Sequence, residues 1–125
     1  MAGQISVKTV SPMLAVADMD ETLSFYRELL GFEPVMSSPG YAIVARDGQL
    51  IHFQKADSVD VLNAVRGHTE IYIEVHGIHA LWDQVKAFKT RFKIRDLFDR
   101  DYGMTEFHIT DPNGCLIFVG EPTAK

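Results

Sequence analysis

DGQLIHF at residues 47–53 and NGCLIFV at residues 113–119 are two versions of one short pattern, and this repeat decides the fold. Each version begins with a dipeptide, Asp-Gly or Asn-Gly, that favours a tight turn, and continues with a β-prone run. The residues before each turn are suited to the incoming strand, with Tyr41 and Phe107 at equivalent places. We therefore predict two β-hairpins of related sequence.

In the first half of the chain, a strand and a helix precede the hairpin. Apolar residues 13–16 suit a strand, and Asp18 with Glu21 three positions later is typical of a helix N-terminus. Leucine and tyrosine residues then recur at helical spacing until Gly31, which is expected to end the helix. A further short strand is predicted at residues 33–36.

The second half repeats this order of elements. Residues 71–75 form a β-branched run, and residues 78–88 carry an apolar stripe at helical spacing. A further short strand is predicted at residues 92–97, before the second hairpin. Each half therefore reads as strand, helix and three strands.

These elements predict an α+β fold built from two tandem βαβββ modules. We expect one domain over residues 1–125, with module one at about 5–57, a linker at about 58–68 and module two at about 69–122. One helix covers one face of each small mixed sheet, so the helices lie on the outside. The other faces of the two sheets are then free to form a curved cleft.

Composition restricts the possible partners. The chain has 125 residues, 46% of them hydrophobic and 23% charged, with a net charge of −5 and scattered basic residues, which disfavours nucleic-acid binding. We find no apolar run of membrane-spanning length and no signal-peptide pattern at the start, so we expect a cytoplasmic protein. The single cysteine, Cys115, has no partner for an internal disulfide.

Three stretches resemble the vicinal oxygen chelate superfamily, which includes glyoxalase I, extradiol dioxygenases, fosfomycin-resistance enzymes and bleomycin-resistance proteins. They are PMLAVADMDETLSFYRELLGFE (12–33), GYAIVARDGQLIHF (40–53) and YGMTEFHITDPNGCLIFVGE (102–121). The last stretch is closest in pattern to bleomycin-resistance proteins. The resemblance covers nearly the whole chain and implies the two-module fold, whereas the superfamily hosts many chemistries on that scaffold.

The resemblance also indicates four positions in the wall of the cleft. In metal-dependent members, the first and last strands of each module each provide one metal ligand. The matching residues here are Ser11, His52, Glu70 and Phe118. The internal repeat supports the same set, because Ser11 aligns with Glu70 and His52 aligns with Phe118.

This set does not favour a metal site. A catalytic divalent metal normally needs about three protein ligands, and only His52 and Glu70 have suitable side chains. We therefore expect no metal and no cofactor. Strand alternation adds Met13, Gln54 and Tyr72 to the predicted ligand-binding residues, with Leu50 and Leu116 on the same faces.

The favoured function is that of a glyoxalase/bleomycin resistance-like protein that binds a small aromatic or cationic molecule without a complete metal site. The family resemblance also implies a homodimer, in which modules pair to complete the cleft. One alternative is a metal-dependent lyase, isomerase or dioxygenase that uses His52, Glu70 and an additional residue such as Glu106 or His108. Another is a metal-free enzyme with His52 or Glu70 as general base.

Overall fold

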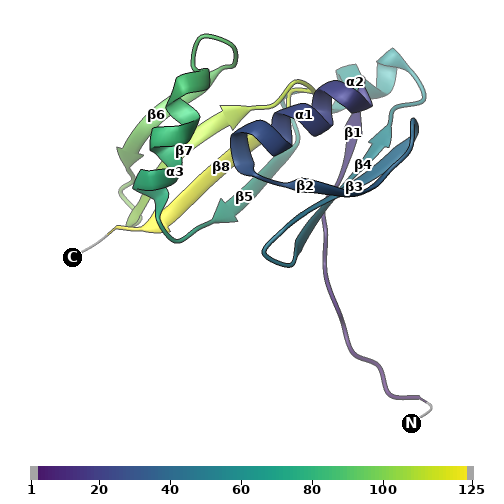
Figure 1. Cartoon of the computed structure of the whole chain (residues 1–125), viewed down its shortest axis with the longest axis horizontal. Coiled ribbons are helices and arrows are strands. Elements are labelled where there is room, and N and C mark those ends of the chain that lie inside the picture. Colours follow the sequence, from purple (N-terminus) through teal and green to yellow (C-terminus); the bar gives the residue numbers. More distant parts are fainter. Residues whose placement is uncertain (1–2, 124–125) are drawn as a thin grey trace.

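A computed structural model describes residues 3–123, and its strands form two separate four-stranded sheets (Figure 1). The first half contains β1 (Met13–Val16), α1 (Met19–Leu30), β2 (Glu33–Ser37), β3 (Tyr41–Arg46) and β4 (Gln49–Lys55). Its strands lie in the order β1-β4-β3-β2. No helix within residues 3–123 has the length and apolar character needed to cross a membrane.

The second half repeats the arrangement with the strand order β5-β8-β7-β6. It contains β5 (Glu70–Glu74), α3 (Ile78–Val85) with a short 3-10 helix at Lys86–Phe88, β6 (Ile94–Asp99), β7 (Met104–Thr110) and β8 (Leu116–Pro122). The predicted α+β fold of two βαβββ units is confirmed. The segment between the halves, predicted only as a linker, contains an additional helix, α2 (Val59–Val65).

The ends of α1 follow the sequence signals. Oδ1 of Asp18 accepts a hydrogen bond of 2.9 Å from the backbone N–H of Glu21, so an otherwise unpaired helical N–H is satisfied. At the other end, Gly31 has a φ of 68°, and its N–H donates to the carbonyl of Arg27 at 3.0 Å. Both predicted boundaries of this helix are confirmed.

Strand register confirms the alignment of His52 with Phe118. β1 lies parallel to β4 with Met13 opposite His52, and β5 lies parallel to β8 with Tyr72 opposite Phe118. The two modules therefore place equivalent residues at equivalent points of their sheets.

The predicted equivalence of Tyr41 and Phe107 is wrong. The first hairpin has a two-residue turn, with Asp47 and Gly48 at φ angles of 50° and 80°, whereas residues 111–115 form a longer loop in the second. The longer loop shifts the register, so Tyr41 lies beside His52 with ring centroids 5.8 Å apart. Phe107 instead packs against Trp82 of α3, with ring centroids 5.3 Å apart.

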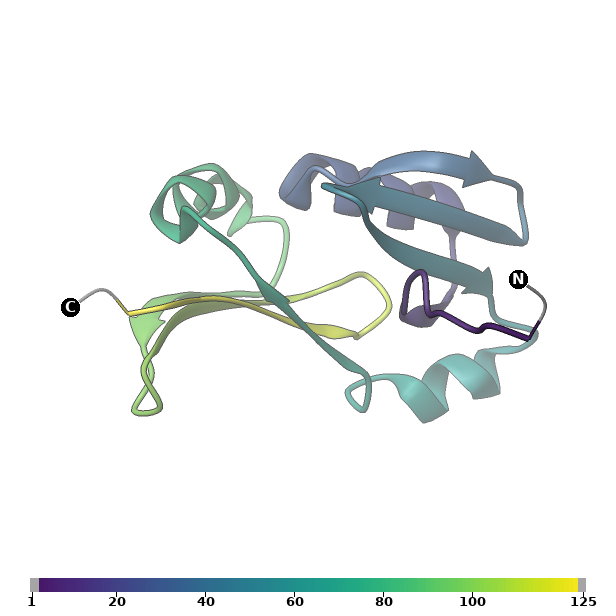
Figure 2. The same cartoon turned by 90° about the horizontal axis from the view of Figure 1, so that it is seen from below.

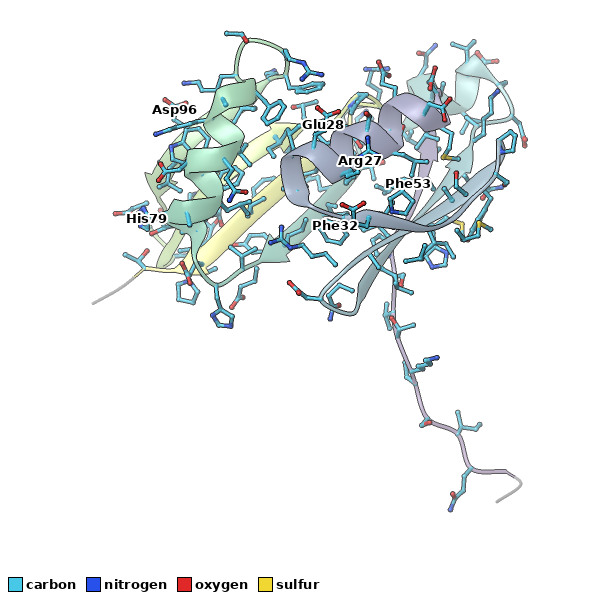
Figure 3. All side chains as sticks on the ribbon, viewed as in Figure 1. Arg27, Glu28, Phe32, Phe53, His79 and Asp96 are labelled. Atoms are coloured by element: carbon cyan, nitrogen blue, oxygen red, sulfur yellow. The ribbon has the colours of Figure 1, made fainter. Side chains whose placement is uncertain are left out.

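One helix packs on one face of each sheet. Tyr26 of α1 packs on Phe53 of the first sheet with ring centroids 4.9 Å apart, and α3 packs on the second sheet through Trp82. Figure 3 shows Phe53 beneath α1, and Figure 2 shows α3 on one side of the second sheet. We call the opposite face of each sheet its inner face.

The tip of the second hairpin is hydrogen-bonded to the first module. The hydroxyl of Tyr26 donates to Oδ2 of Asp111 at 2.7 Å. Asn113 accepts from the N–H of Ala17 at 2.8 Å and donates to the hydroxyl of Thr22 at 3.0 Å. Asp111 and Asn113 are each only 4% exposed, so these polar groups pair away from water. We call this set of contacts the inter-module latch.

Burial dominates the electrostatics of the latch. It raises the pKa of Asp111, although hydrogen bonds from Tyr26 and from the backbone of Cys115 and Asn113 oppose the shift. Burial and the neighbouring Asp111 carboxylate raise the pKa of Tyr26 well above its ordinary value. The Tyr26 hydroxyl therefore keeps its proton and remains a donor at neutral pH.

The N-terminal segment before β1 lies outside both sheets. Figure 1 shows it extending away from the rest of the chain. Its apolar side chains are open to solvent, with Ile5, Val7 and Val10 exposed to 93%, 78% and 86%. We call residues 3–12 the N-terminal arm.

Candidate functional site

A row of side chains crosses the inner face of the second sheet. Tyr72 on β5 lies opposite Phe118 on β8, which lies opposite His108 on β7, which in turn lies opposite Arg95 on β6. The ring centroids of Tyr72 and Phe118 are 6.2 Å apart, and those of Phe118 and His108 are 3.9 Å apart. Tyr72, Phe118 and the buried His108 therefore form a nearly continuous series of rings, which we call the aromatic row.

A buried carboxylate supports this row from the neighbouring position on β7. The side chain of Glu106 is completely buried and accepts hydrogen bonds from side chains that surround it. The donors are Tyr72 Oη at 2.8 Å, Tyr102 Oη at 2.7 Å, Arg100 Nη1 at 3.0 Å and His108 Nε2 at 2.8 Å. Each carboxylate oxygen thus has two partners, as a buried charge requires.

These partners keep Glu106 ionised. Burial alone would raise the pKa of this carboxyl, but hydrogen bonds from His108, Tyr102 and Tyr72, with the charge of Arg100, lower it to about 2. Because Glu106 is ionised at neutral pH, Nε2 of His108 carries a proton toward it. In the neutral imidazole, Nδ1 is then the hydrogen-bond acceptor.

Both tyrosines remain neutral donors. Desolvation and the hydrogen bond to Glu106 raise the pKa of Tyr72, while the hydrogen bond to Glu106 is the main cause that raises the pKa of Tyr102. The two residues are nevertheless 46% and 54% exposed. Each tyrosine therefore has a fixed hydroxyl and an accessible ring.

Gly120 allows Tyr72 to reach the carboxylate. A Cβ atom at position 120 would lie 2.1 Å from Tyr72 Oη and 3.1 Å from Cγ of Glu106, so any side chain there would displace the tyrosine. This glycine lies within β8, where glycine normally weakens a strand. Its role is to admit the close approach of the tyrosine hydroxyl.

The inner face of the first sheet carries the other predicted residues. Tyr41 Oη and His52 Nδ1 form a hydrogen bond of 2.6 Å, and Met13 lies opposite His52 in the parallel β1–β4 pair. Gln54 lies opposite Tyr41. Met13 and Gln54 also line a hollow of about 230 Å³ that reaches Val61 of α2.

The predicted ligand-binding residues therefore form two groups. Met13, His52 and Gln54 lie on the first sheet, with Ser11 just before it. Glu70, Tyr72 and Phe118 lie on the second sheet. Among residues 3–123, no hydrogen bond, ion pair or ring contact joins one group to the other.

Glu70 and Ser11, which align in the internal repeat, differ in burial. Glu70 is exposed at the start of β5, opposite Leu116. The Ser11 hydroxyl oxygen is buried and has no hydrogen-bond partner within the described residues.

Over residues 3–123, no three His, Cys, Asp or Glu side chains gather closely enough to hold a metal ion. The expectation of a protein without metal or cofactor stays a prediction.

Part of the Glu106 cluster is not predicted from the sequence. Glu106 and His108 are predicted only as additional residues of the alternative metal-dependent site, and no role is predicted for Arg100 or Tyr102. The available signal was the alternation in β7, where Glu106 and His108 occupy the face opposite Phe107. Two polar residues on one face of an otherwise apolar strand indicate a satisfied polar cluster.

Comparisons with known proteins agree with this architecture. A model of the Glyoxalase/Bleomycin resistance protein/Dioxygenase superfamily matches residues 8–119. The bleomycin resistance protein of Geobacillus stearothermophilus is 28% identical over 119 positions, which cover 85% of this chain and 90% of the relative.

Solved structures share the fold at low sequence identity. A bleomycin-binding protein complexed with bleomycin has a TM-score of 0.78 and 21% identity, covering 92% of this chain and 98% of its own. A glyoxalase-related enzyme from Clostridium phytofermentans has a TM-score of 0.75 and 22% identity, covering 98% of this chain and 99% of its own. The shared scaffold thus extends over both modules.

Proposed function

Because the chain belongs to the glyoxalase/bleomycin resistance protein/dioxygenase superfamily, we propose that it binds a small planar aromatic molecule on the aromatic row. Tyr72 and Phe118 provide ring surfaces for stacking, and the buried His108 ring supports Phe118 on the side toward β6. Binding of this kind requires a complementary surface and no chemical step.

The observation that carries this proposal is the combination of exposed rings and a rigid support. Tyr72 is nearly half exposed, yet its hydroxyl is fixed by the buried Glu106 carboxylate. A surface held in place before the ligand arrives loses little conformational entropy on binding. A tyrosine that served only in packing would need neither an exposed ring nor a hydroxyl held by a buried carboxylate.

We further propose that a second copy of the chain supplies the opposite wall of the cleft. His52, Met13 and Gln54 on the inner face of the first sheet would then face the aromatic row of the partner. The exposed N-terminal arm supports a homodimer, because its apolar side chains are suited to strand addition at a sheet edge. Among the described residues, the carbonyl of Pro12 is the only backbone group of the arm with a hydrogen-bond partner. The orphaned Ser11 hydroxyl lies at the base of this arm.

Glu70 is proposed as a counter-charge for a cationic group on the ligand. It is exposed on the edge strand β5, two residues before Tyr72 and on the same face. A cation at this edge of the row would approach both a carboxylate and a tyrosine ring.

We also propose a cytoplasmic location. A buried free thiol such as that of Cys115 stays reduced in the cytoplasm.

Calorimetric titration with planar aromatic compounds, selected by a thermal-shift screen, tests the function. The wild-type protein should bind planar compounds better than saturated analogues of the same size, and Phe118→Ala should weaken that binding at least severalfold. Val59→Ala, which truncates an exposed apolar residue on α2, serves as the control. Equal binding by both variants would count against the aromatic row as the site.

A further inference from the structure

We propose that the aromatic molecule bound by this protein carries a carboxylate, held by Arg95 and Arg100 at the β6 end of the aromatic row. This inference rests on the proposed function, because it assigns a chemical class to the ligand of the same surface. It goes beyond that function because it specifies an anionic group at the edge opposite Glu70.

A β-bulge places Arg95 and Phe98 on the same face of the second sheet. The pairing of β6 with β7 shifts between Arg95 and Phe98, so that Arg95 lies opposite His108 and Phe98 lies opposite Glu106. Both partners belong to the inner face of the second sheet. Without the extra residue, two side chains three positions apart in a strand would point to opposite faces.

Both guanidinium groups lie against the same ring. Arg95 Cζ is 3.7 Å from the centroid of the Phe98 ring, and Arg100 Cζ is 5.2 Å from it. The Phe98 ring meets His108 edge-on with centroids 5.3 Å apart, which joins it to the aromatic row. Stacking restricts the two long side chains before a ligand binds, so fewer rotamers are lost on binding.

Of the two arginines, only Arg100 has an ion-pair partner among the described residues. Glu106 offsets Arg100, because Oε1 and Nη1 are 3.0 Å apart. Within residues 3–123, no carboxylate forms an ion pair with Arg95. Of the neighbouring carboxylates, Asp96 pairs with Lys89, Asp99 accepts from the hydroxyl of Thr105 at 2.8 Å, and the charge of Asp101 acts on Tyr102.

Unused donors provide the means of recognition. Arg100 contacts Glu106 through Nη1, and its Nε and Nη2 groups have no hydrogen-bond partner among the described residues. Arg95 is exposed, and its guanidinium is free to donate. Planar guanidinium groups pair with carboxylates through two parallel hydrogen bonds. A flat aromatic acid would therefore place its ring on the row and its carboxylate beside the arginines.

A pair of matched probes tests the charge separately from the ring. Calorimetry would compare 2-naphthoate with neutral 2-naphthamide, which has nearly the same shape. We expect the wild-type protein to bind 2-naphthoate about tenfold more tightly at low ionic strength, the equivalent of about 1.4 kcal/mol and one charge-assisted hydrogen bond. This preference should decrease as salt is added.

Two arginine variants locate the effect. Arg95→Gln should reduce the preference for 2-naphthoate to nearly one while keeping the binding of 2-naphthamide. Arg27→Gln removes the same charge from an exposed position on α1, on the helical side (Figure 3), and should keep the full preference. Circular dichroism of each variant verifies that it is folded.

The possible results distinguish a failure of the carboxylate assignment from a failure of the proposed aromatic site. Equal binding of both probes by the wild-type protein, or an unchanged preference in Arg95→Gln, would overturn the anionic assignment and leave the aromatic site standing. Binding of neither probe would overturn the proposed aromatic function and this inference with it. Loss of preference in Arg27→Gln as well would show a general charge effect, which also contradicts the assignment to Arg95.

Discussion

The hydroxyl of Tyr26 lies 2.7 Å from Oδ2 of Asp111, although the two residues are 85 positions apart in the sequence. One belongs to the first helix and the other to the tip of the last hairpin. Their hydrogen bond and those of Asn113 act with the packing of Phe25 against Phe92 to hold the second module on the first. The relative position of the two inner faces therefore depends in part on a few buried polar atoms.

Tyr26→Phe should destabilise the fold by about 1–3 kcal/mol, the usual cost of leaving a buried polar partner unsatisfied. The substitution keeps the ring against Phe53 and removes only the donor to Asp111. Urea denaturation measures the free energy of unfolding. Ser24→Ala, which removes an exposed hydroxyl from the same helix, should change it far less. Similar losses in both variants would mean that the latch contributes little.

The Glu106 cluster should make stability depend on pH in the acid range. The pKa of Glu106 falls from its ordinary 4.5 to about 2 on folding, so the ionised carboxylate stabilises the folded state. That contribution is complete above pH 4.5 and is lost on acidification toward pH 2. The difference in unfolding free energy between wild type and Glu106→Gln should therefore shrink over this range. Urea titrations at several pH values would reveal a constant difference if this linkage is wrong.

Gly120→Ala should disturb the aromatic row without touching the latch. The new methyl group would lie 2.1 Å from Tyr72 Oη, so the tyrosine must leave Glu106 and expose a buried charge. We expect a lower urea midpoint and weaker binding of planar aromatic compounds. Gly40→Ala is the matched control, because a Cβ atom there has open space. Adding Tyr72→Phe to Gly120→Ala should relieve part of the clash, and no relief would indicate another cause.

The N-terminal arm should control assembly. Replacing Ile5, Val7 and Val10 by serine removes apolar groups that are exposed in the isolated chain, so the fold should remain stable. The proposed dimer, however, should dissociate at protein concentrations where the wild type is expected to remain paired. Sedimentation velocity across the micromolar range measures this. Gln4→Ala, Ser6→Ala and Thr9→Ala together form the control for the same segment. A wild-type protein that is monomeric throughout would contradict the homodimer.

Local patterns were sufficient to predict most of the scaffold. The N-cap at Asp18 and the end of α1 at Gly31 depend on residues within one helical turn of each boundary, so the sequence displays them directly. The repeated strand register likewise follows from alternation within short segments. By contrast, α2 has no buried side chain, and such a helix produces no apolar stripe to detect.

The contacts that complete the site could not be read from local patterns. The donors to Glu106 come from β5, β7 and the turn that carries Tyr102, and only folding brings them together. Alternation placed Tyr72 and Phe118 on one face, but the bulge that brings Arg95 to that face has no distinct sequence signature. The equivalence of Tyr41 with Phe107 was predicted wrongly because two turns that contain similar dipeptides, Asp-Gly and Asn-Gly, have different lengths.

The unequal hairpin tips have a consequence for protein engineering. Asp47 and Gly48 form an exposed tip with no neighbour within 4 Å of a Cβ atom built at Gly48, so a peptide grafted there would project into solvent. The same graft between Asn113 and Gly114 would separate the halves, because that tip is buried against α1. Two sites that look interchangeable in the sequence are therefore a permissive insertion point and a forbidden one.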